Sequence, residues 1–214
     1  MHQTSVPSHA SVIVIGGGIM GCSTLYHLAQ MGVGDAILLE RNKLTSGTTW
    51  HSAAQVRALR HSQNLTRMIQ YSVDLYSRLE QETGQNVGWI QKGSLSIATS
   101  EGRLTHIGRQ EALARAYGVD ARSISAGEAK ERWSLMNADD VIGAVWSPDD
   151  GRVSPSDVCA ALVKAAKARG GQIFEDTGVT GILTRNGRVY GVETTQGKIT
   201  CDCLLYTSPS PRDS

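Results

Sequence analysis

The glycine-rich segment at residues 16–21 is the part of the sequence whose residue types and spacing point most directly to chemistry. It reads GGGIMG, which places Gly16, Gly18 and Gly21 in a GxGxxG pattern. In such a pattern the first glycine permits a tight turn, the second lets a pyrophosphate approach the backbone, and the third lets a helix pack closely on a sheet. The free amide groups and the dipole at the start of that helix attract phosphate. The motif therefore predicts a dinucleotide site.

An acidic residue follows the motif at the spacing that ribose recognition requires. Glu40 ends the apolar run at residues 36–39 and lies 19 residues after Gly21. A carboxylate at that place accepts hydrogen bonds from a ribose diol and repels a 2′-phosphate, so NADP is disfavoured. The spacing itself does not separate NAD from FAD.

The elements that must position these residues follow from the hydrophobic pattern. The segment at residues 11–15 contains four consecutive β-branched aliphatic residues, 12–15, as in a strand buried on both faces. Together with a helix at 22–31 and a strand at 36–39 it predicts a βαβ unit. Helical spacing returns at 64–83 and 104–117, and Ser125 and Glu128 have capping-box spacing at the start of a short helix. The remaining predicted elements are a half-buried strand at 89–98, a helix at 154–169, a strand at 172–175, and a meander of strands at 180–184, 188–194 and 198–202. The meander turns at Asn186-Gly187 and Gln196-Gly197.

Composition and charge exclude several classes of function. There are 21 basic and 20 acidic side chains, which gives no electrostatic reason to expect nucleic acid or an anionic membrane as a partner. No apolar run reaches the roughly 20 residues of a membrane span, and residues 1–10 do not resemble a signal peptide, so we expect a cytoplasmic protein. The four cysteines have neither disulfide-framework nor zinc-site spacing, and we expect no metal. They are Cys22, Cys159, Cys201 and Cys203.

The segment after the second strand carries a family resemblance. Residues 40–53 read ERNKLTSGTTWHSA, and they resemble the flavin-binding loop of the D-amino-acid-oxidase-type superfamily, in its dimethylglycine and sarcosine dehydrogenase branch. The similarity continues through residues 64–99, 148–170 and 187–202, and so covers roughly residues 11–202. The TTWH element at 48–51 is its most specific part.

The resemblance implies FAD as the cofactor and an α/β fold, α+β overall. We expect a Rossmann-like FAD-binding domain with a β-meander, joined to part of an antiparallel-sheet substrate domain and truncated. His51 of the WH pair is at the position where these enzymes attach FAD covalently, through the 8α position of the flavin. His27 and His106 lack such a context and are interpreted as structural, whereas His61 is kept as a pocket candidate. The expected cofactor-binding residues are Gly16, Gly18, Gly21, Glu40, Arg41, Ser46, Gly47, Thr48, Thr49 and His51.

The implied reaction is oxidation of a C–H bond beside nitrogen in a small N-methylated amino acid, with hydride passing to the flavin. Arg57 and Arg60 are candidates for the substrate carboxylate by location only, and no catalytic residue is assigned. The resemblance also implies an electron-transfer flavoprotein as acceptor, folate for a further C-terminal region, and the mitochondrial matrix as the location in a eukaryote.

The sequence departs from the family near its end. Where a further apolar strand is expected after Asp202, the chain reads CLLYTSPSPRDS. We therefore expect an N-terminal fragment that folds poorly, does not retain FAD and is inactive alone. The expected division is a disordered N-terminus at 1–10, the FAD-binding domain at 11–85 and 148–203, an inserted part of the substrate domain at 86–147, and a non-family tail at 204–214.

Two alternatives remain open at this point. The chain could belong to a catalytically silent regulatory relative that kept the dehydrogenase fold. It could also belong to an FAD amino-acid oxidase acting on another substrate, such as glycine or proline, in which a covalent histidine is not expected.

Overall fold

The computed structural model describes residues 5–206, and these residues form two compact units. The first unit comprises residues 5–53, 79–87 and 154–206, and the second comprises residues 54–78 and 88–153. The first unit is thus assembled from three separate stretches of chain. The boundary expected at residue 85 differs from this division, because residues 54–78 group with the second unit.

A six-stranded sheet forms the centre of the first unit, in the order β8-β2-β1-β11-β10-β9. Its parallel part contains β1 (His9–Ile15), β2 (Ile37–Leu39) and β8 (Gln172–Phe174). Ile13 and Val14 are adjacent in β1 and both are fully buried. The β-branched run therefore occupies the two-sided burial that the sequence predicts.

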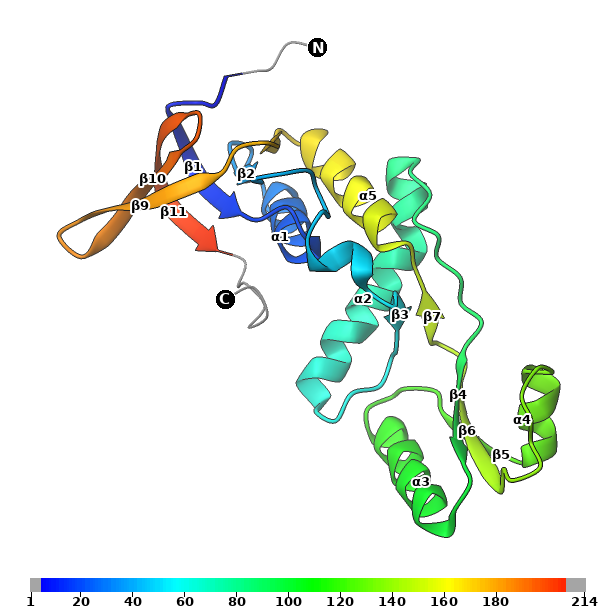
Figure 1. Ribbon diagram of the computed structural model, residues 1–214. Helices are drawn as coiled ribbons and strands as arrows, with labels where there is room; N and C mark the ends of the chain where they lie inside the picture. The colour runs from blue at the N-terminus through cyan, green and yellow to red at the C-terminus, as the bar shows by residue number, and fades with distance from the viewer. Residues whose placement is uncertain (1–4, 207–214) are drawn as a thin grey trace. The chain divides into compact units, whose positions relative to one another are not determined.

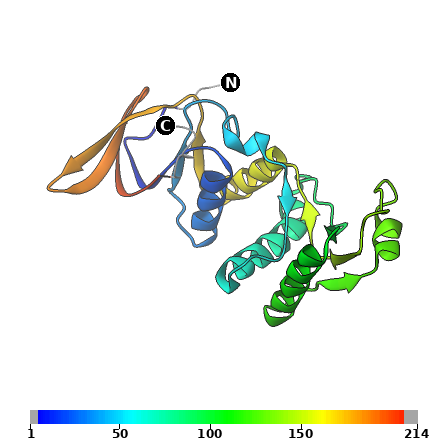
Figure 2. The same ribbon diagram turned by 60° about the horizontal axis from the view of Figure 1, so that its bottom comes forward.

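The antiparallel part of the sheet is the predicted meander of β9 (Val179–Arg185), β10 (Arg188–Thr194) and β11 (Gly197–Tyr206). Asn186 and Gly187 both have positive φ at the β9–β10 turn, as a two-residue hairpin of this type requires. In both views the β9–β10 hairpin (orange) extends away from helices α1 and α5 (Figures 1 and 2).

The ends of the sheet differ from two expectations. β11 does not stop at residue 202 but continues to Tyr206, and it pairs in parallel with β1, with Leu204 opposite Ile13. Residues 204–206, assigned to a tail from the sequence, therefore belong to the sheet. His9 and Ala10 lie in β1 rather than in a disordered N-terminus. The predictions for residues 1–4 and 207–214 lie outside the described residues.

Two helices pack together beside the parallel strands: α1 (Ile19–Gln30) and α5 (Pro155–Lys167) (Figure 1). α1 contacts β1 and β2, and α5 contacts β8. Leu25 and Tyr26 of α1 and Leu162 of α5 are buried. Ser154 and Pro155 stand at the N-cap and first position of α5, as the sequence indicates.

The second unit contains a three-stranded antiparallel sheet in the order β4-β6-β5. Its strands are β4 (Ser94–Ala98), β5 (Arg122–Ile124) and β6 (Gly143–Ser147). Helix α3 (Glu101–Ala116) lies along β4 and β6, and the short α4 (Ala126–Arg132) contacts β6 (Figure 2). A second small sheet joins β3 (Gln55–Val56) to β7 (Gly151–Arg152), and α2 (Gln63–Thr83) runs from the second unit into the first.

The antiparallel second unit and the mixed sheet of the first agree with the predicted α/β class. Among the helices of residues 5–206, none combines the length and the apolar character needed to cross a membrane.

Candidate nucleotide-binding site

A cavity of about 590 Å³ opens in the first unit beside the carboxyl ends of β1 and β2. This volume lies in the range of small-molecule sites, and the carboxyl edge of a parallel sheet is where α/β proteins bind ligands. Eight of the ten predicted cofactor-binding residues line it. They are Gly16, Gly18, Glu40, Arg41, Ser46, Gly47, Thr48 and Thr49.

The glycine turn has the geometry that its motif predicts. Gly16 follows β1 with φ +106°, a conformation that favours glycine. A Cβ atom at Gly21 would lie 1.8 Å from the Gly16 carbonyl oxygen, so the third glycine lets the first turn of α1 close against the loop. Gly21 therefore acts by packing, while Gly16 and Gly18 reach the cavity itself.

Glu40 lies directly after β2 and braces the turn. Its Oε2 accepts a hydrogen bond from the Gly17 amide at 2.6 Å, and its Oε1 accepts one from the Asn42 amide at 2.8 Å. Each carboxylate oxygen has two acceptor sites, so these bonds leave capacity for ribose hydroxyls. The predicted ribose acceptor is thus also a support of the glycine loop.

The loop at 45–51 supplies the cap that α1 lacks in its own sequence. Gly18 is the N-cap residue and has no side chain, and Thr49 Oγ1 instead accepts a hydrogen bond from the Ile19 amide at 3.0 Å. The Thr45 amide donates to the Gly17 carbonyl oxygen at 2.9 Å. Thr45 holds φ at +65°, a costly conformation for a β-branched residue. The hydroxyl-rich loop is therefore pinned to the glycine turn rather than merely adjacent to it.

His51 ends the 3₁₀ segment Thr48–His51 and is exposed, outside the lining of the cavity. Its Nδ1 lies 3.2 Å from the Gly47 carbonyl oxygen, and its ring stands against that of Trp50 with centroids 4.0 Å apart. A carbonyl oxygen only accepts, so Nδ1 carries a proton in this contact. In the neutral imidazole, the lone pair is then on Nε2.

The two arginines singled out from the sequence have partners of their own. Arg57, in the second unit, places Nε 3.6 Å from Asp150 Oδ2 and its NH2 group 3.2 Å from Ser96 Oγ. Arg60 donates to the Leu59 carbonyl oxygen at 3.1 Å. His61 is exposed. Arg57 is therefore held in place by a buried carboxylate, which the sequence did not reveal.

The two histidines interpreted as structural make contacts within their own helices. His27 Nδ1 lies 2.7 Å from the Ser23 carbonyl oxygen in α1, and His106 Nε2 lies 3.3 Å from Gln110 Nε2 in α3. These contacts agree with the structural interpretation of both residues.

Two buried thiols lie beneath the glycine turn. Cys22 of α1 and Cys159 of α5 have no exposed surface. A hydrogen bond with Cys159, and then burial, raise the pKa of Cys22 far above its usual range. Burial also raises the pKa of Cys201 in β11. Such thiols stay protonated and unreactive. Within residues 5–206, no cluster of three or more metal-ligating side chains is present.

One wall of the cavity, formed by Thr177 and residues 179–182, was not assigned by sequence reasoning. These residues follow β8, which lies beside β2 although more than 130 residues separate the two strands in the chain. The carboxyl ends of parallel strands lie at one edge of a sheet, and this rule could have suggested these residues. The rule can be applied only when the order of the strands is known.

Comparison with protein families gives one clear match: the model of the DAO family, described as FAD dependent oxidoreductase, matches residues 11–208. Curated relatives include mitochondrial sarcosine dehydrogenase of Mus musculus, 46% identical over 94% of this chain and 22% of the relative. The mitochondrial pyruvate dehydrogenase phosphatase regulatory subunit of Mus musculus is 40% identical, over 95% of this chain and 23% of its own. Mitochondrial dimethylglycine dehydrogenase of Rattus norvegicus is 34% identical, over 95% of this chain and 24% of the relative. The chain thus spans about a quarter of the length of these relatives.

A solved structure resembles the whole described chain. L-proline dehydrogenase from P. horikoshii superposes with a TM-score of 0.90 at 28% identity, covering 95% of this chain and 54% of that one. The predicted fold class is confirmed by this likeness and by the family match.

Proposed function

We propose, from the premise that the chain belongs to the DAO family of FAD-dependent oxidoreductases, that its cavity binds FAD and that it serves oxidation of N-methylated amino acids. The observation that carries this proposal is the joint presence, around one cavity, of the glycine turn, Glu40 and the hydroxyl-rich loop.

The cavity residues fit the nucleotide half of FAD. The turn at Gly16–Gly18 allows a pyrophosphate to approach the backbone at the start of α1, and Glu40 accepts from ribose hydroxyls. Ser46, Thr48 and Thr49 provide hydroxyl donors at the cavity, and Arg41 provides a positive charge beside the phosphates. Retention of FAD was not expected from the sequence because a strand appeared to be missing. The pairing of β11 with β1 as far as Tyr206 supports retention of the cofactor.

His51 is proposed as the covalent anchor of the flavin. The Gly47 carbonyl holds the proton on Nδ1, which directs the Nε2 lone pair to act as the nucleophile. Trp50 limits rotation of the imidazole by standing against it. The position of His51 beside the cavity-lining residues Gly47, Thr48 and Thr49 supports this role.

The proposed reaction is of the sarcosine and dimethylglycine dehydrogenase type. When bound, FAD accepts a hydride from the carbon beside the substrate nitrogen. The chain's own residues hold the nucleotide, fix the histidine tautomer and brace the glycine turn. Arg57 is a candidate for the substrate carboxylate because Asp150 and Ser96 fix its guanidinium while 43% of its side chain stays exposed.

Partners and location follow from the same relatives. We propose an electron-transfer flavoprotein as the electron acceptor, folate as a second ligand of a longer protein, and the mitochondrial matrix as the location. The sarcosine and dimethylglycine dehydrogenases that the chain resembles are mitochondrial, which supports the last of these over the cytoplasm.

The attachment is tested by denaturing the FAD-loaded chain and examining the polypeptide for flavin fluorescence after electrophoresis. We expect fluorescence in the wild type and in His61→Ala, and none in His51→Ala. Free FAD released from the wild type would contradict the covalent role of His51 and would favour the glycine- or proline-oxidase alternative.

A second candidate function has a specific observation behind it, because the chain is 40% identical to a phosphatase regulatory subunit. In that case the chain would bind FAD without using it for oxidation. Anaerobic addition of sarcosine or dimethylglycine to a longer FAD-loaded protein that contains this chain and the rest of the substrate domain separates the two. Loss of the oxidised-flavin absorption band supports the dehydrogenase, and an unchanged band supports the regulatory relative.

A further inference from the structure

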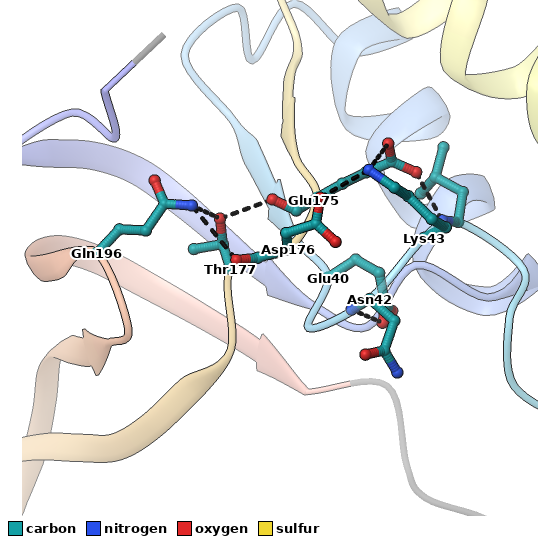
Figure 3. A network of polar contacts seen from close by, with 8 residues as sticks. Glu40, Asn42, Lys43, Glu175, Asp176, Thr177 and Gln196 are labelled. Atoms are coloured by element: carbon teal, nitrogen blue, oxygen red, sulfur yellow. Dashed lines mark hydrogen bonds and ion pairs between the residues drawn. The ribbon is translucent and has the colours of Figure 1, made fainter. Parts of the chain in front are cut away.

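Three loops of the first unit are joined beside the cavity by a chain of polar contacts (Figure 3). The first loop is residues 40–44 after β2, the second is residues 175–178 between β8 and β9, and the third is the β10–β11 turn at 195–196. The first two contribute cavity-lining residues, among them Asn42 and Thr177. The third loop does not line the cavity, but the side chain of Gln196 reaches from it to the second loop.

The first and second loops are joined by both backbone and side chains. The Asp176 amide donates to the Asn42 carbonyl oxygen at 2.9 Å, and the Thr177 amide donates to the Glu40 carbonyl oxygen at 2.8 Å. Lys43 Nζ lies 2.6 Å from Asp176 Oδ2. Because Lys43 and Asp176 are exposed, this ion pair contributes little by itself, and the backbone bonds set the spacing of the two loops.

The second and third loops are joined through Gln196. Its Nε2 donates to Thr177 Oγ1 at 2.7 Å and to the Asp176 carbonyl oxygen at 3.3 Å. The Thr177 hydroxyl in turn donates to the Glu175 carbonyl oxygen at 2.9 Å. Thr177 is only 1% exposed, so its hydroxyl depends on these protein partners.

The second loop, residues 175–178, contains a strained backbone position that needs such support. Asp176 has φ +51°, in the left-handed region that a residue with a side chain adopts at a cost. Gln196 Nε2 donates hydrogen bonds to the Asp176 carbonyl oxygen and to Thr177 Oγ1. The Thr177 amide donates to the carbonyl oxygen of Glu40, the predicted ribose acceptor. The contacts of Gln196 therefore fix the wall next to the ribose end of the cavity.

We propose that Gln196 is a positioning residue that holds the Thr177 wall in the conformation that binds the adenosine half of the nucleotide. This inference rests on the proposed binding of FAD in the cavity. Gln196 touches no ligand in this account. It acts through Thr177, which lines the cavity, and its removal leaves the glycine turn itself intact.

The test measures dissociation constants of ADP and of inorganic pyrophosphate for the full chain by calorimetry. Gln196→Leu keeps the approximate volume and removes the donor, and we expect the dissociation constant of ADP to rise about tenfold, as for the loss of one or two hydrogen bonds. The dissociation constant of pyrophosphate is expected to stay within twofold, because pyrophosphate binds at the glycine turn. Lys198→Met is the matched control: it removes an exposed ion pair with Glu193 in the same two strands, and both affinities should be unchanged.

A second variant keeps the test decisive where Gln196→Leu folds poorly. Thr177→Val removes the acceptor hydroxyl and should weaken ADP binding to a similar extent. A chain that carries both Gln196→Leu and Thr177→Val should bind ADP no more weakly than either single variant does. Equal ADP affinity in the wild type and both single variants would overturn the inference, as would an equal loss of ADP and pyrophosphate binding. A wild type that binds neither ADP nor FAD would instead overturn the proposed function.

Discussion

At the residue scale, the site is set by a few contacts, and only the local ones could be predicted. Gly16, Gly18 and Gly21 are within six residues of one another and next to a clear strand and helix, so their roles followed from the sequence. The cap that Thr49 gives to Ile19 spans 30 residues, and the bond from Gln196 to Thr177 spans 19. Contacts of that kind depend on how loops meet, which a single sequence does not encode in any local pattern.

The Thr49 cap gives a prediction for both stability and binding. Thr49→Val keeps the shape of the side chain and removes the hydroxyl that accepts from the Ile19 amide. We expect the free energy of unfolding to fall by about 1 kcal/mol and FAD to bind several-fold more weakly. Urea unfolding and FAD titration measure the two effects. Thr24→Val, which removes a side-chain bond to the Met20 carbonyl oxygen within the same helix, is the control. An equal loss of FAD affinity in both variants would argue against the cap.

The buried carboxylate of Asp150 in the second unit gives a second prediction, for stability. The side chain of Asp150 is 3% exposed, and it accepts hydrogen bonds from the Ala58 amide at 2.7 Å and from Ser94 Oγ at 2.5 Å while pairing with Arg57. Asp150→Asn turns one acceptor into a donor facing other donors, so we expect destabilisation of about 1–3 kcal/mol. Chemical denaturation should reveal this loss, whereas the exposed Asp140→Asn should unfold like the wild type. An Asp150→Asn chain of unchanged stability would contradict the account.

At the element scale, helices and hairpins were predictable wherever capping and turn residues agree with the hydrophobic period. The helix expected at 64–83 and the strand expected at 188–194 match α2 and β10 closely. The strand predicted at 198–202 is shorter than β11 because Pro209 and the serines near it favour a loop after Asp202. The outer part of β11 is a strand because Leu204 and Leu205 pair with the already buried β1, a tertiary reason that propensity does not contain.

The capping box of α4 gives a pH-dependent prediction. Hydrogen bonds from the Ser125 amide and hydroxyl lower the pKa of Glu128. A lowered pKa in the folded state means that this contribution to stability is complete above the ordinary glutamate pKa and is lost as pH falls through the folded value.

The corresponding change is Ser125→Ala. We expect the pKa of Glu128 to move back toward its usual value, and loss of the Ser125 cap to cost about 1 kcal/mol at neutral pH. The difference from the wild type should narrow in acid. Carboxyl NMR titration and unfolding at pH 7 and pH 3 measure these quantities, and Ser72→Ala in the interior of α2 is the control. A pKa of Glu128 that is the same in wild type and Ser125→Ala would refute the capping box as its cause.

At the scale of the whole molecule, the chain builds its nucleotide site from stretches that lie far apart in sequence. β8 pairs with β2 and β11 pairs with β1, so the last quarter of the described residues completes the sheet begun by the first. The sequence indicated the class of fold and an interrupted domain, but the strand order β8-β2-β1-β11-β10-β9 is a property of the assembled sheet. For the same reason, one wall of the cavity was predictable and the wall at Thr177 and residues 179–182 was not.

The most direct test of the central claim is titration of FAD into the purified chain, followed by flavin absorption and calorimetry, with Gly21→Ala beside the wild type. An added Cβ would lie 1.8 Å from the Gly16 carbonyl oxygen and force the turn open, whereas Gly102→Ala places its Cβ in open space on α3 and is the control. We expect one FAD per chain for the wild type and Gly102→Ala, and binding weakened about a hundredfold in Gly21→Ala, as for overpacking of about 3 kcal/mol. A wild-type chain without affinity for FAD, or a Gly21→Ala chain that binds FAD as well as the wild type does, would contradict the proposed nucleotide site.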